Sequence, residues 1–259
     1  MAWLLRGLRQ GVVTSRYPRR SDVYGRGYMA AIAVLHAPDK SSADDELAAL
    51  CPTGAILADG RLRVDRGRCI LCGRCVEARP DLFAFDGSPE VGRIGRRALL
   101  VPDEDEEAVE EVRAELAKRT RFLRRSIHVR HVDAGSDGSE EWEVAALTNP
   151  VYDVQRLGIF FTATPRHADL LLVTGVGTAG MAGPLRLTYE AMPFPKVVLA
   201  AGTDAISGGL LHSSYAGADG IGSVVPVDVW VPGSPPSPFS LLHGILVAVG
   251  FLAENRAVT

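Results

Sequence analysis

The chain contains the run Cys69-Ile70-Leu71-Cys72-Gly73-Arg74-Cys75, and its one remaining cysteine lies upstream in Cys51-Pro52. A C-x-x-C-x-x-C run places three thiolates on one tight loop, and a distant Cys-Pro pair can supply the fourth ligand of an iron-sulfur cluster. The spacing therefore predicts one 4Fe-4S cluster held by Cys51, Cys69, Cys72 and Cys75. A structural zinc site is the alternative, but zinc motifs usually pair two C-x-x-C knuckles.

These cysteines match half of a two-cluster pattern. The paired repeats of bacterial ferredoxins carry a second set of ligand positions, which here read Ser41, Asp44, Leu47 and Arg79. None of these side chains can bind iron through sulfur, so a second cluster of this kind is not expected. The sequence resembles a ferredoxin-like domain that has kept one complete ligand set and lost the other.

The composition is that of a globular chain with room for two domains, because 259 residues carry 47% hydrophobic side chains and a net charge of -3. This charge argues against nucleic acid as a partner. Few cysteines and an oxygen-sensitive type of site predict a reducing, cytoplasmic compartment without disulfides. We find no signal-peptide pattern and no apolar run of about 18 residues, so no membrane-spanning segment is expected.

The first thirteen residues mix apolar and basic side chains. The apolar ones recur at roughly helical spacing and are Trp3, Leu4, Leu5, Leu8, Val12 and Val13. Arg6 and Arg9 lie between them. This pattern is typical of a helix that lies in a membrane interface, and the alternative is a surface helix packed on its own domain or on a partner.

Changes of composition divide the chain into four parts. They are an N-terminal interfacial helix and arm (1–30), a ferredoxin-like domain with one cluster (31–101), a charged and solvated connecting helix (102–125) and an α/β domain (126–259). In the last part, apolar runs at 127–132, 169–174, 196–200 and 224–229 alternate with helical stretches such as 184–192 and 239–254. The alternation predicts a parallel sheet covered on both faces. The fold class is therefore α/β, with a ferredoxin-like iron-sulfur domain followed by a flavodoxin-like parallel domain.

A glycine motif follows one of the expected strands. Gly175-Val-Gly177-Thr-Ala-Gly180 has the G-x-G-x-x-G spacing of a dinucleotide fingerprint, and Asp204 follows the next strand. Such a motif arises easily by chance in a chain with 27 glycines. Pro184 also fits a helix that begins late better than a helix whose first turn binds pyrophosphate.

Four stretches of the second half carry a family resemblance. They are residues 126–135, 149–158, 164–175 and 227–236. They resemble the small electron-transfer subunit of energy-converting nickel-iron hydrogenases, a family that includes the complex I subunit carrying the terminal cluster. The first hundred residues resemble the ferredoxin subunit of the same complexes, so two subunits are fused in this chain.

The resemblance implies partners and a location. The expected partners are a hydrogenase-like or complex I-like large subunit, with membrane antiporter-like and quinone-site-type subunits. The expected location is peripheral, on the cytoplasmic side of the cell membrane. In that family the N-terminal helix of the ferredoxin subunit lies on the membrane surface, which favours the interfacial interpretation of residues 1–13.

The chain departs from this family at the terminal cluster. The four cysteines that hold this cluster in the family are replaced here by Asp137, Glu140, Asp204 and Ser234. Iron-sulfur clusters are held chiefly by soft thiolates, so the terminal cluster is not expected. In the family, the position of Arg166 lies near the cluster. The emptied site is therefore expected to hold either a polar network centred on Arg166 or a solvated pocket.

Two hypotheses of different class follow. The first is a peripheral-arm subunit of a membrane-bound complex, with one cluster retained, electron transfer curtailed and a role in assembly or coupling. The second is a stand-alone iron-sulfur oxidoreductase that binds a nucleotide at Gly175–Gly180. Only the second hypothesis requires the chain to bind NAD or flavin.

Overall fold

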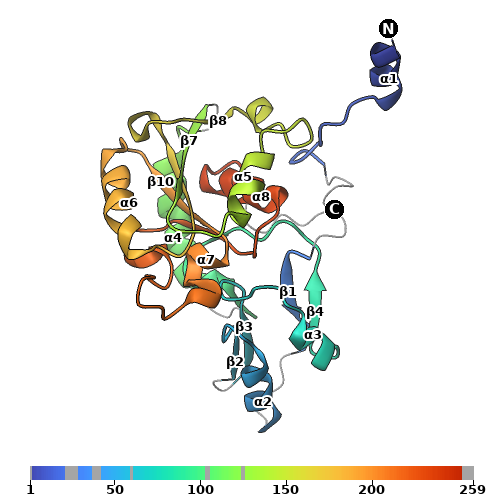
Figure 1. Cartoon of the computed structure of the whole chain (residues 1–259), viewed down its shortest axis with the longest axis vertical. Coiled ribbons are helices and arrows are strands. Elements are labelled where there is room, and N and C mark those ends of the chain that lie inside the picture. Colours follow the sequence, from blue (N-terminus) through green and yellow to red (C-terminus); the bar gives the residue numbers. More distant parts are fainter. Residues whose placement is uncertain are drawn as a thin grey trace.

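The computed structural model describes residues 2–20, 29–36, 42–58, 61–102, 106–123 and 126–252. A smaller, cysteine-bearing half lies below a larger α/β half in Figure 1. The smaller half consists of β1 (Ala31–Val34), α2 (Ser42–Leu50), β2 (Ile56–Ala58), β3 (Leu62–Asp65), α3 (Arg74–Ala78), β4 (Phe83–Asp86) and β6 (Leu100–Val101). β1 pairs with β4, and β3 joins β2 to β6, all antiparallel. Both small sheets contribute to one apolar cluster that includes Ile32, Leu62 and Phe83.

The larger half is built on a six-stranded sheet. Its strands in spatial order are β5 (Arg93–Ile94), β11 (Val229–Val231), β10 (Val197–Ala201), β9 (Leu170–Thr174), β7 (Ile127–Asp133) and β8 (Ile159–Phe161). The neighbours from β11 to β8 are parallel, and β5 is antiparallel to β11. If the five parallel strands are numbered 1 to 5 along the chain, from β7 to β11, their order across the sheet is 2-1-3-4-5. This is the flavodoxin-like order. The predicted α/β fold class is confirmed.

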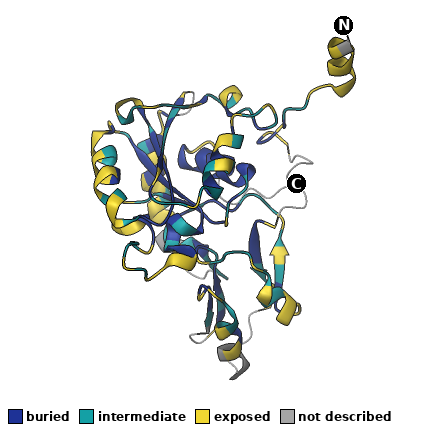
Figure 2. Ribbon diagram, in the orientation of Figure 1, coloured by how far each residue is buried: buried dark blue, intermediate teal, exposed yellow. Residues whose placement is uncertain are grey.

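Both faces of this sheet are covered. Leu170 and Leu172 of β9 belong to an apolar cluster that also contains side chains of α8 (Pro238–Ala248), whereas Leu171 belongs to a second cluster with side chains of α6 (Ala179–Ala191). Successive side chains of a strand point to opposite faces, so a strand buried on both sides reads as a continuous apolar run. Figure 2 shows the central strands and α8 as the most buried elements.

Four further helices complete the description. They are α1 (Ala2–Gln10), α4 (Glu106–Thr120), α5 (Ser139–Ala146) and α7 (Thr203–Ser207). Leu116 of α4 and Val144 of α5 join the cluster on the α8 side, and Ile206 of α7 joins the cluster on the α6 side. The segment 102–125, expected as a solvated connecting helix, therefore buries one side of α4 against the α/β half.

The edge strand β5 comes from the range expected to be ferredoxin-like. It pairs with β11 through Ile94 and Val229 and through Arg93 and Trp230. Just before it, the backbone N–H of Gly92 donates to Nδ1 of the buried His243 on α8 at 3.2 Å. The two halves therefore share a sheet, and the expected boundary at residue 101 does not coincide with the boundary of that sheet.

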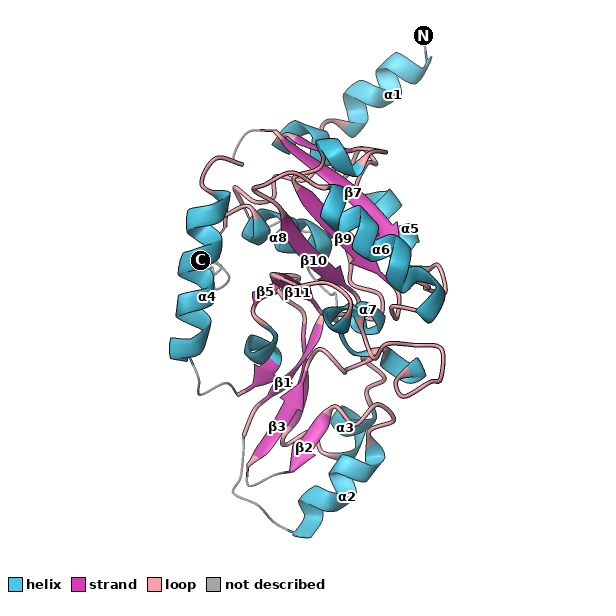
Figure 3. Ribbon diagram, turned by 90° about the vertical axis from the view of Figure 1, so that its left-hand side faces the viewer, coloured by secondary structure: helices cyan, strands magenta, loops and turns pink. Residues whose placement is uncertain are grey.

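The N-terminal arm is bound to the α/β half. The N–H of Ser15 donates to the carbonyl of Val151 at 2.8 Å, and Arg156 Nη2 donates to the carbonyl of Tyr17 at 2.6 Å. Beyond this arm, α1 stands clear of the body at the end of the molecule opposite α2 (Figures 1 and 3). No helix in the described part of the chain is both long enough and apolar enough to cross a bilayer.

Three expected elements have different bounds in the structure. The last strand is Val229–Val231 instead of 224–229, because Pro226 has no N–H to donate to a sheet and the preceding residues form a 3-10 turn at Ile221–Ser223. α6 begins at Ala179, so Pro184 lies inside the helix and does not start it. α8 ends at Ala248, shortly before Gly250 adopts a positive φ of 68°.

Candidate metal centre

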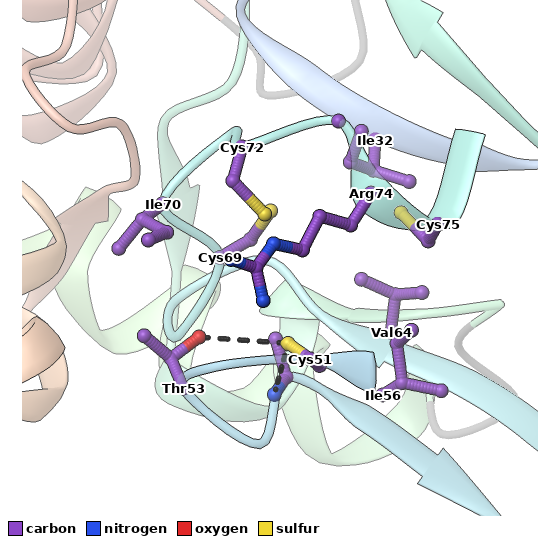
Figure 4. A pocket seen from close by; sticks show the side chains of 12 residues that line it. Ile32, Cys51, Thr53, Ile56, Val64, Cys69, Ile70, Cys72, Arg74 and Cys75 are labelled. Carbon is purple, nitrogen blue, oxygen red and sulfur yellow. Dashed lines mark hydrogen bonds between the residues drawn. The ribbon is translucent and has the colours of Figure 1, made fainter. Parts of the chain in front are cut away.

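All four cysteines line one pocket (Figure 4). Cys51 follows α2, Cys69 and Cys72 lie on the loop before α3, and Cys75 lies in the first turn of α3. The rest of the lining is mainly apolar and includes Ile32, Ile56, Val64 and Ile70. The structure thus brings together every thiol in the chain, although Cys51 is separated from the others by the β2–β3 hairpin.

The backbone around the pocket is shaped to face the sulfurs. Leu71 and Gly73 have positive φ angles of 57° and 77°, which turn the loop tightly between its cysteines. The N–H of Leu71 lies 3.4 Å from Cys69 Sγ, and the N–H of Ala55 lies 3.2 Å from Cys51 Sγ. Amide hydrogen bonds to ligand sulfurs are one of the means by which a protein sets the potential of an iron-sulfur cluster.

Burial keeps two of the thiols protonated when no metal is bound. It raises the pKa of Cys69 to about 12 and also raises the pKa of Cys75. Metal binding must therefore displace protons from these thiols. Cys72 is exposed, which leaves one side of the pocket open to solvent.

The donor set fits an iron-sulfur cluster better than a single ion. A single zinc ion needs its ligands to converge on one point at about 2.3 Å. Within the described ranges, no three His, Cys, Asp or Glu residues are grouped so that they could hold one metal ion. In a 4Fe-4S cluster each thiolate binds its own iron, so four cysteines arranged around a pocket suit this group.

A second polar site lies where the parallel strands of the large sheet end. Asp137 and Glu140 follow β7, Asp204 follows β10, and Ser234 follows β11. Because the carboxyl ends of parallel strands share one edge of the sheet, these positions all follow strands at that edge. The charges of Asp137 and Asp204 both contribute to raising the pKa of Glu140.

Glu140 is the buried member of this group, with 2% of its surface exposed. Its Oε2 accepts a hydrogen bond from Ser139 Oγ at 3.1 Å, and its carboxylate packs over Gly202, where a Cβ would lie 2.5 Å from Oε1. Burial raises the pKa of Glu140 to about 7, with a smaller contribution from Asp204. Burial likewise raises the pKa of Asp204, whereas hydrogen bonds from Ser139 lower the pKa of Asp137.

The remaining two expected residues, Ser234 and Arg166, do not contact Glu140 through any hydrogen bond or ion pair seen in the described part of the chain. Ser234 is exposed, and it follows Gly233, whose carbonyl accepts a hydrogen bond from the N–H of Thr203 at 2.8 Å. Arg166 is exposed on a short 3-10 helix, Pro165–His167, and forms no ion pair with a described carboxylate. The structure therefore gives no support to a network centred on Arg166.

The short helix α7 connects the two sites, a role that sequence reasoning did not assign. Thr203 Oγ1 lies 3.0 Å from the carbonyl oxygen of Cys69 and 3.1 Å from that of Gly233. One turn later, Ser207 Oγ lies 2.9 Å from the carbonyl oxygen of Gly67. The available signal was Thr203, a hydroxyl-bearing residue at the start of a helix that follows a buried strand. The sequence could not indicate its partner, because the cysteine loop lies more than a hundred residues away in the chain.

Three backbone donors of the glycine motif are already bonded within the fold. The N–H groups of Val176, Thr178 and Ala179 already donate to the carbonyls of Gly135, Ala134 and Ala216. A Cβ at Gly175 would lie 2.6 Å from the backbone of Gly135. The glycines thus allow neighbouring loops to pack closely, and three amides of the loop are already used within the fold and not offered to a pyrophosphate.

Family comparisons agree with this two-part construction. Residues 138–248 match the family described as NADH ubiquinone oxidoreductase, 20 Kd subunit. Residues 62–115 match a 4Fe-4S single cluster domain, a range that contains three of the four cysteines and not Cys51.

Two curated proteins are similar to the chain. Formate hydrogenlyase subunit 7 of Escherichia coli (strain K12) is 37% identical over 157 residues, which is 61% of this chain and 60% of that protein. The probable membrane-bound hydrogenase subunit mbhJ of Pyrococcus furiosus is 39% identical over 139 residues, which is 54% of this chain and 83% of that protein. The alignment with the Escherichia coli protein thus leaves more than a third of that protein uncovered.

A solved structure of the membrane-bound sulfane sulfur reductase, an archaeal respiratory membrane complex, contains a chain that is 31% identical. The alignment covers 51% of this chain and 75% of that one, with a TM-score of 0.44.

Proposed function

Because this chain belongs to the family of the NADH ubiquinone oxidoreductase 20 Kd subunit and also carries a 4Fe-4S single cluster domain, we propose that it is a peripheral iron-sulfur subunit of a membrane-bound complex related to complex I and to energy-converting hydrogenases. In this proposal the chain holds one 4Fe-4S cluster and lacks the terminal cluster. Electron transfer is therefore curtailed, and the chain has a role in assembly or coupling.

One observation carries the proposal: the only four cysteines of the chain line the same pocket. Cys51, Cys69, Cys72 and Cys75 would hold the cluster, which, when bound, takes up and releases single electrons. The N–H groups of Ala55 and Leu71 would stabilise the negative charge on the ligand sulfurs, as they already face Cys51 and Cys69. The apolar lining residues would exclude water from most of the pocket.

The second half would not hold a cluster. The thiolates needed there are replaced by Asp137, Glu140, Asp204 and Ser234, and the buried Glu140 with its near-neutral pKa can occupy the space as an uncharged acid. A route for electrons that runs through a terminal cluster is therefore interrupted in this domain.

The partners and the membrane contact are part of the same proposal. By analogy with its relatives, the chain would bind a hydrogenase-like or complex I-like large subunit and would lie near antiporter-like and quinone-site-type membrane subunits on the cytoplasmic side. The helix α1 supports a membrane contact, since Trp3, Leu5 and Leu8 are exposed on it beside Arg6 and Arg9. The alternative of a stand-alone, nucleotide-binding oxidoreductase is weaker, because three amides of the glycine loop are already bonded within the fold.

Metal analysis tests the proposal directly. Anaerobically purified chain should contain about four irons and show one reducible cubane signal in electron paramagnetic resonance. Replacing Cys72 with Ser should remove or cripple this signal, while Ser234→Ala, at the emptied site, should leave iron and signal unchanged. Eight irons per chain, or stoichiometric zinc without visible absorption, would contradict the proposal.

A further inference from the structure

A buried positive charge lies beside the cysteine pocket. The side chain of Arg66 is 12% exposed, and its Nε donates to the carbonyl of Ile32 at 3.0 Å. Ile32 itself lines the pocket. Arg66 also accepts, through its own carbonyl, a hydrogen bond from the N–H of Cys69 at 3.4 Å. The residue that carries the guanidinium thus belongs to the turn that leads into Cys69, and Ile32 holds its side chain beside the pocket.

This charge is only partly neutralised. Its one carboxylate partner in the described part of the chain is Asp86, whose Oδ2 lies 3.4 Å from Arg66 Nη2 and whose side chain is 32% exposed. Burial lowers the pKa of Arg66, while the negative charges of Asp86 and Cys69 raise it. The guanidinium and the Cys69 thiolate are therefore coupled electrostatically in a region with little water to screen them.

Building on the proposed cluster, we propose that Arg66 is a tuning residue that raises the reduction potential of that cluster. Reduction transfers one electron from a low-potential one-electron carrier to the cluster, and no covalent bond is made or broken. The added negative charge spreads over the cube and its thiolates. A fixed positive charge nearby stabilises the reduced form more than the oxidised form, and Asp86 offsets part of this effect.

Arg74 is the competing source of positive charge, and its position differs. It also lines the pocket, where Figure 4 shows it among the cysteines, but it is exposed to solvent. Dissolved salt screens an exposed charge, whereas a buried one keeps most of its influence. A potential set by Arg66 should therefore depend little on ionic strength.

The experiment is a redox titration of the full-length chain, reconstituted anaerobically with iron and sulfide and followed by electron paramagnetic resonance. Arg66→Gln should lower the ratio of reduced to oxidised cluster roughly tenfold at a fixed potential, a shift of about 59 mV for one electron. Asp86→Asn should shift the potential in the opposite direction. Both shifts should persist in 1 M salt. Arg66→Lys, which keeps the charge, should remain near the wild type, and the exposed Arg186→Gln of α6 is the matched control without effect.

Opposite shifts for Arg66→Gln and Asp86→Asn support the inference, since loss of a purely structural contact gives no reason for opposite signs. Unchanged potentials in both variants, with four irons retained, would overturn it, as would shifts that vanish in high salt. If the Arg66→Gln variant does not bind a cluster, the Asp86→Asn variant alone tests the inference. A higher reduction potential in that variant supports the inference, and an unchanged potential refutes it. A wild-type chain that binds no cluster would instead refute the proposed function.

Discussion

Under the proposed function, a single buried acid takes the place of a cluster ligand in the second half of the chain. Glu140 stands where a cysteine ligand is expected, and its pKa is raised to about 7 by burial. The folded protein therefore binds the proton of Glu140 more tightly than the unfolded chain does. Below the ordinary pKa of 4.5, Glu140 is protonated in both states and does not destabilise the fold. As the pH rises from 4.5 towards 7, the unfolded chain loses this proton first, so the free energy of unfolding falls.

Glu140→Gln should remove this pH dependence. Between pH 5 and pH 8 the wild-type chain should lose stability relative to the variant, by on the order of 2–3 kcal/mol at the alkaline end. Thermal unfolding across this range measures the difference. Asp137→Asn is the control, because the pKa of Asp137 is lowered from its ordinary 3.8, so this carboxylate stays charged from pH 5 to pH 8 and the variant should keep the pH dependence of the wild type. Parallel curves for wild type and Glu140→Gln would show that Glu140 is solvated.

At the scale of elements, α7 is where the cysteine loop meets the large sheet. The hydroxyls of Thr203 and Ser207 reach the carbonyls of Cys69 and Gly67, and a Cβ at Gly67 would lie 2.7 Å from Ile206 Cγ2. One short helix therefore holds the loop by both polar and apolar contacts.

Thr203→Val should weaken this attachment. The variant keeps the shape of the side chain but removes the hydroxyl donor of the Cys69 carbonyl, which costs about 1–3 kcal/mol, whereas the carbonyl of Gly233 keeps the backbone N–H of residue 203. Denaturant unfolding of the full chain measures the loss. Thr188→Val is the matched control, because the hydroxyl of Thr188 bonds only to the local carbonyl of Pro184 in α6. Equal stabilities for the two variants would mean that the Thr203 contacts contribute nothing.

The exposed helix α1 gives a second prediction at this scale. Leu8→Glu should weaken binding of the chain to vesicles of anionic phospholipid, because it places a charge on the apolar side of an interfacial helix. Vesicle flotation measures the binding. Leu187→Glu on α6 is the control, since Leu187 is similarly exposed, at 67% against 75% for Leu8. If both variants float like the wild type, α1 does not contact the membrane.

The elements that the sequence predicted well are those whose signal is local. The runs around β7, β9 and β10 have the apolar character of strands buried on both faces, and the cysteine spacing needed no knowledge of the fold. The role of α7 was not predictable in this way, because Thr203 meets Cys69 only through folding. The place of Arg166 was expected only from resemblance, and the structure leaves its side chain exposed on the short helix Pro165–His167, where it pairs with no carboxylate of the described residues.

At the scale of the whole molecule, the two halves are joined more closely than a linker would join them. β5 lies at the edge of the large sheet, and Gly92 approaches α8 so closely that a Cβ there would lie 2.9 Å from Gly244 Cα. The His243 ring also lies 3.1 Å from this position, but the nearest atom belongs to the Gly244 backbone, so a side-chain rotation alone cannot relieve the contact.

Gly92→Ala should therefore weaken the docking of β5. We expect a loss of about 1–3 kcal/mol from overpacking, and unfolding of the two halves should become less cooperative. Denaturant unfolding followed by separate probes of each half tests both effects. Gly183→Ala in α6 is the control, because nothing lies within 4 Å of its added Cβ and alanine favours a helix. A single, unshifted transition for Gly92→Ala would rule out a rigid contact at this position.

The shared sheet also has a consequence for biosynthesis. An edge strand supplied from within the same polypeptide completes the sheet at an effective concentration fixed by chain length, which for short connections is in the millimolar range. The cell does not need to balance the expression of two separate proteins or to protect an unpaired sheet edge while one waits for the other. Covalent fusion thus guarantees one cysteine-bearing half for every α/β half, and a chain that lacks the residues up to and including β5 would display the open edge of β11 as a site for misassembly.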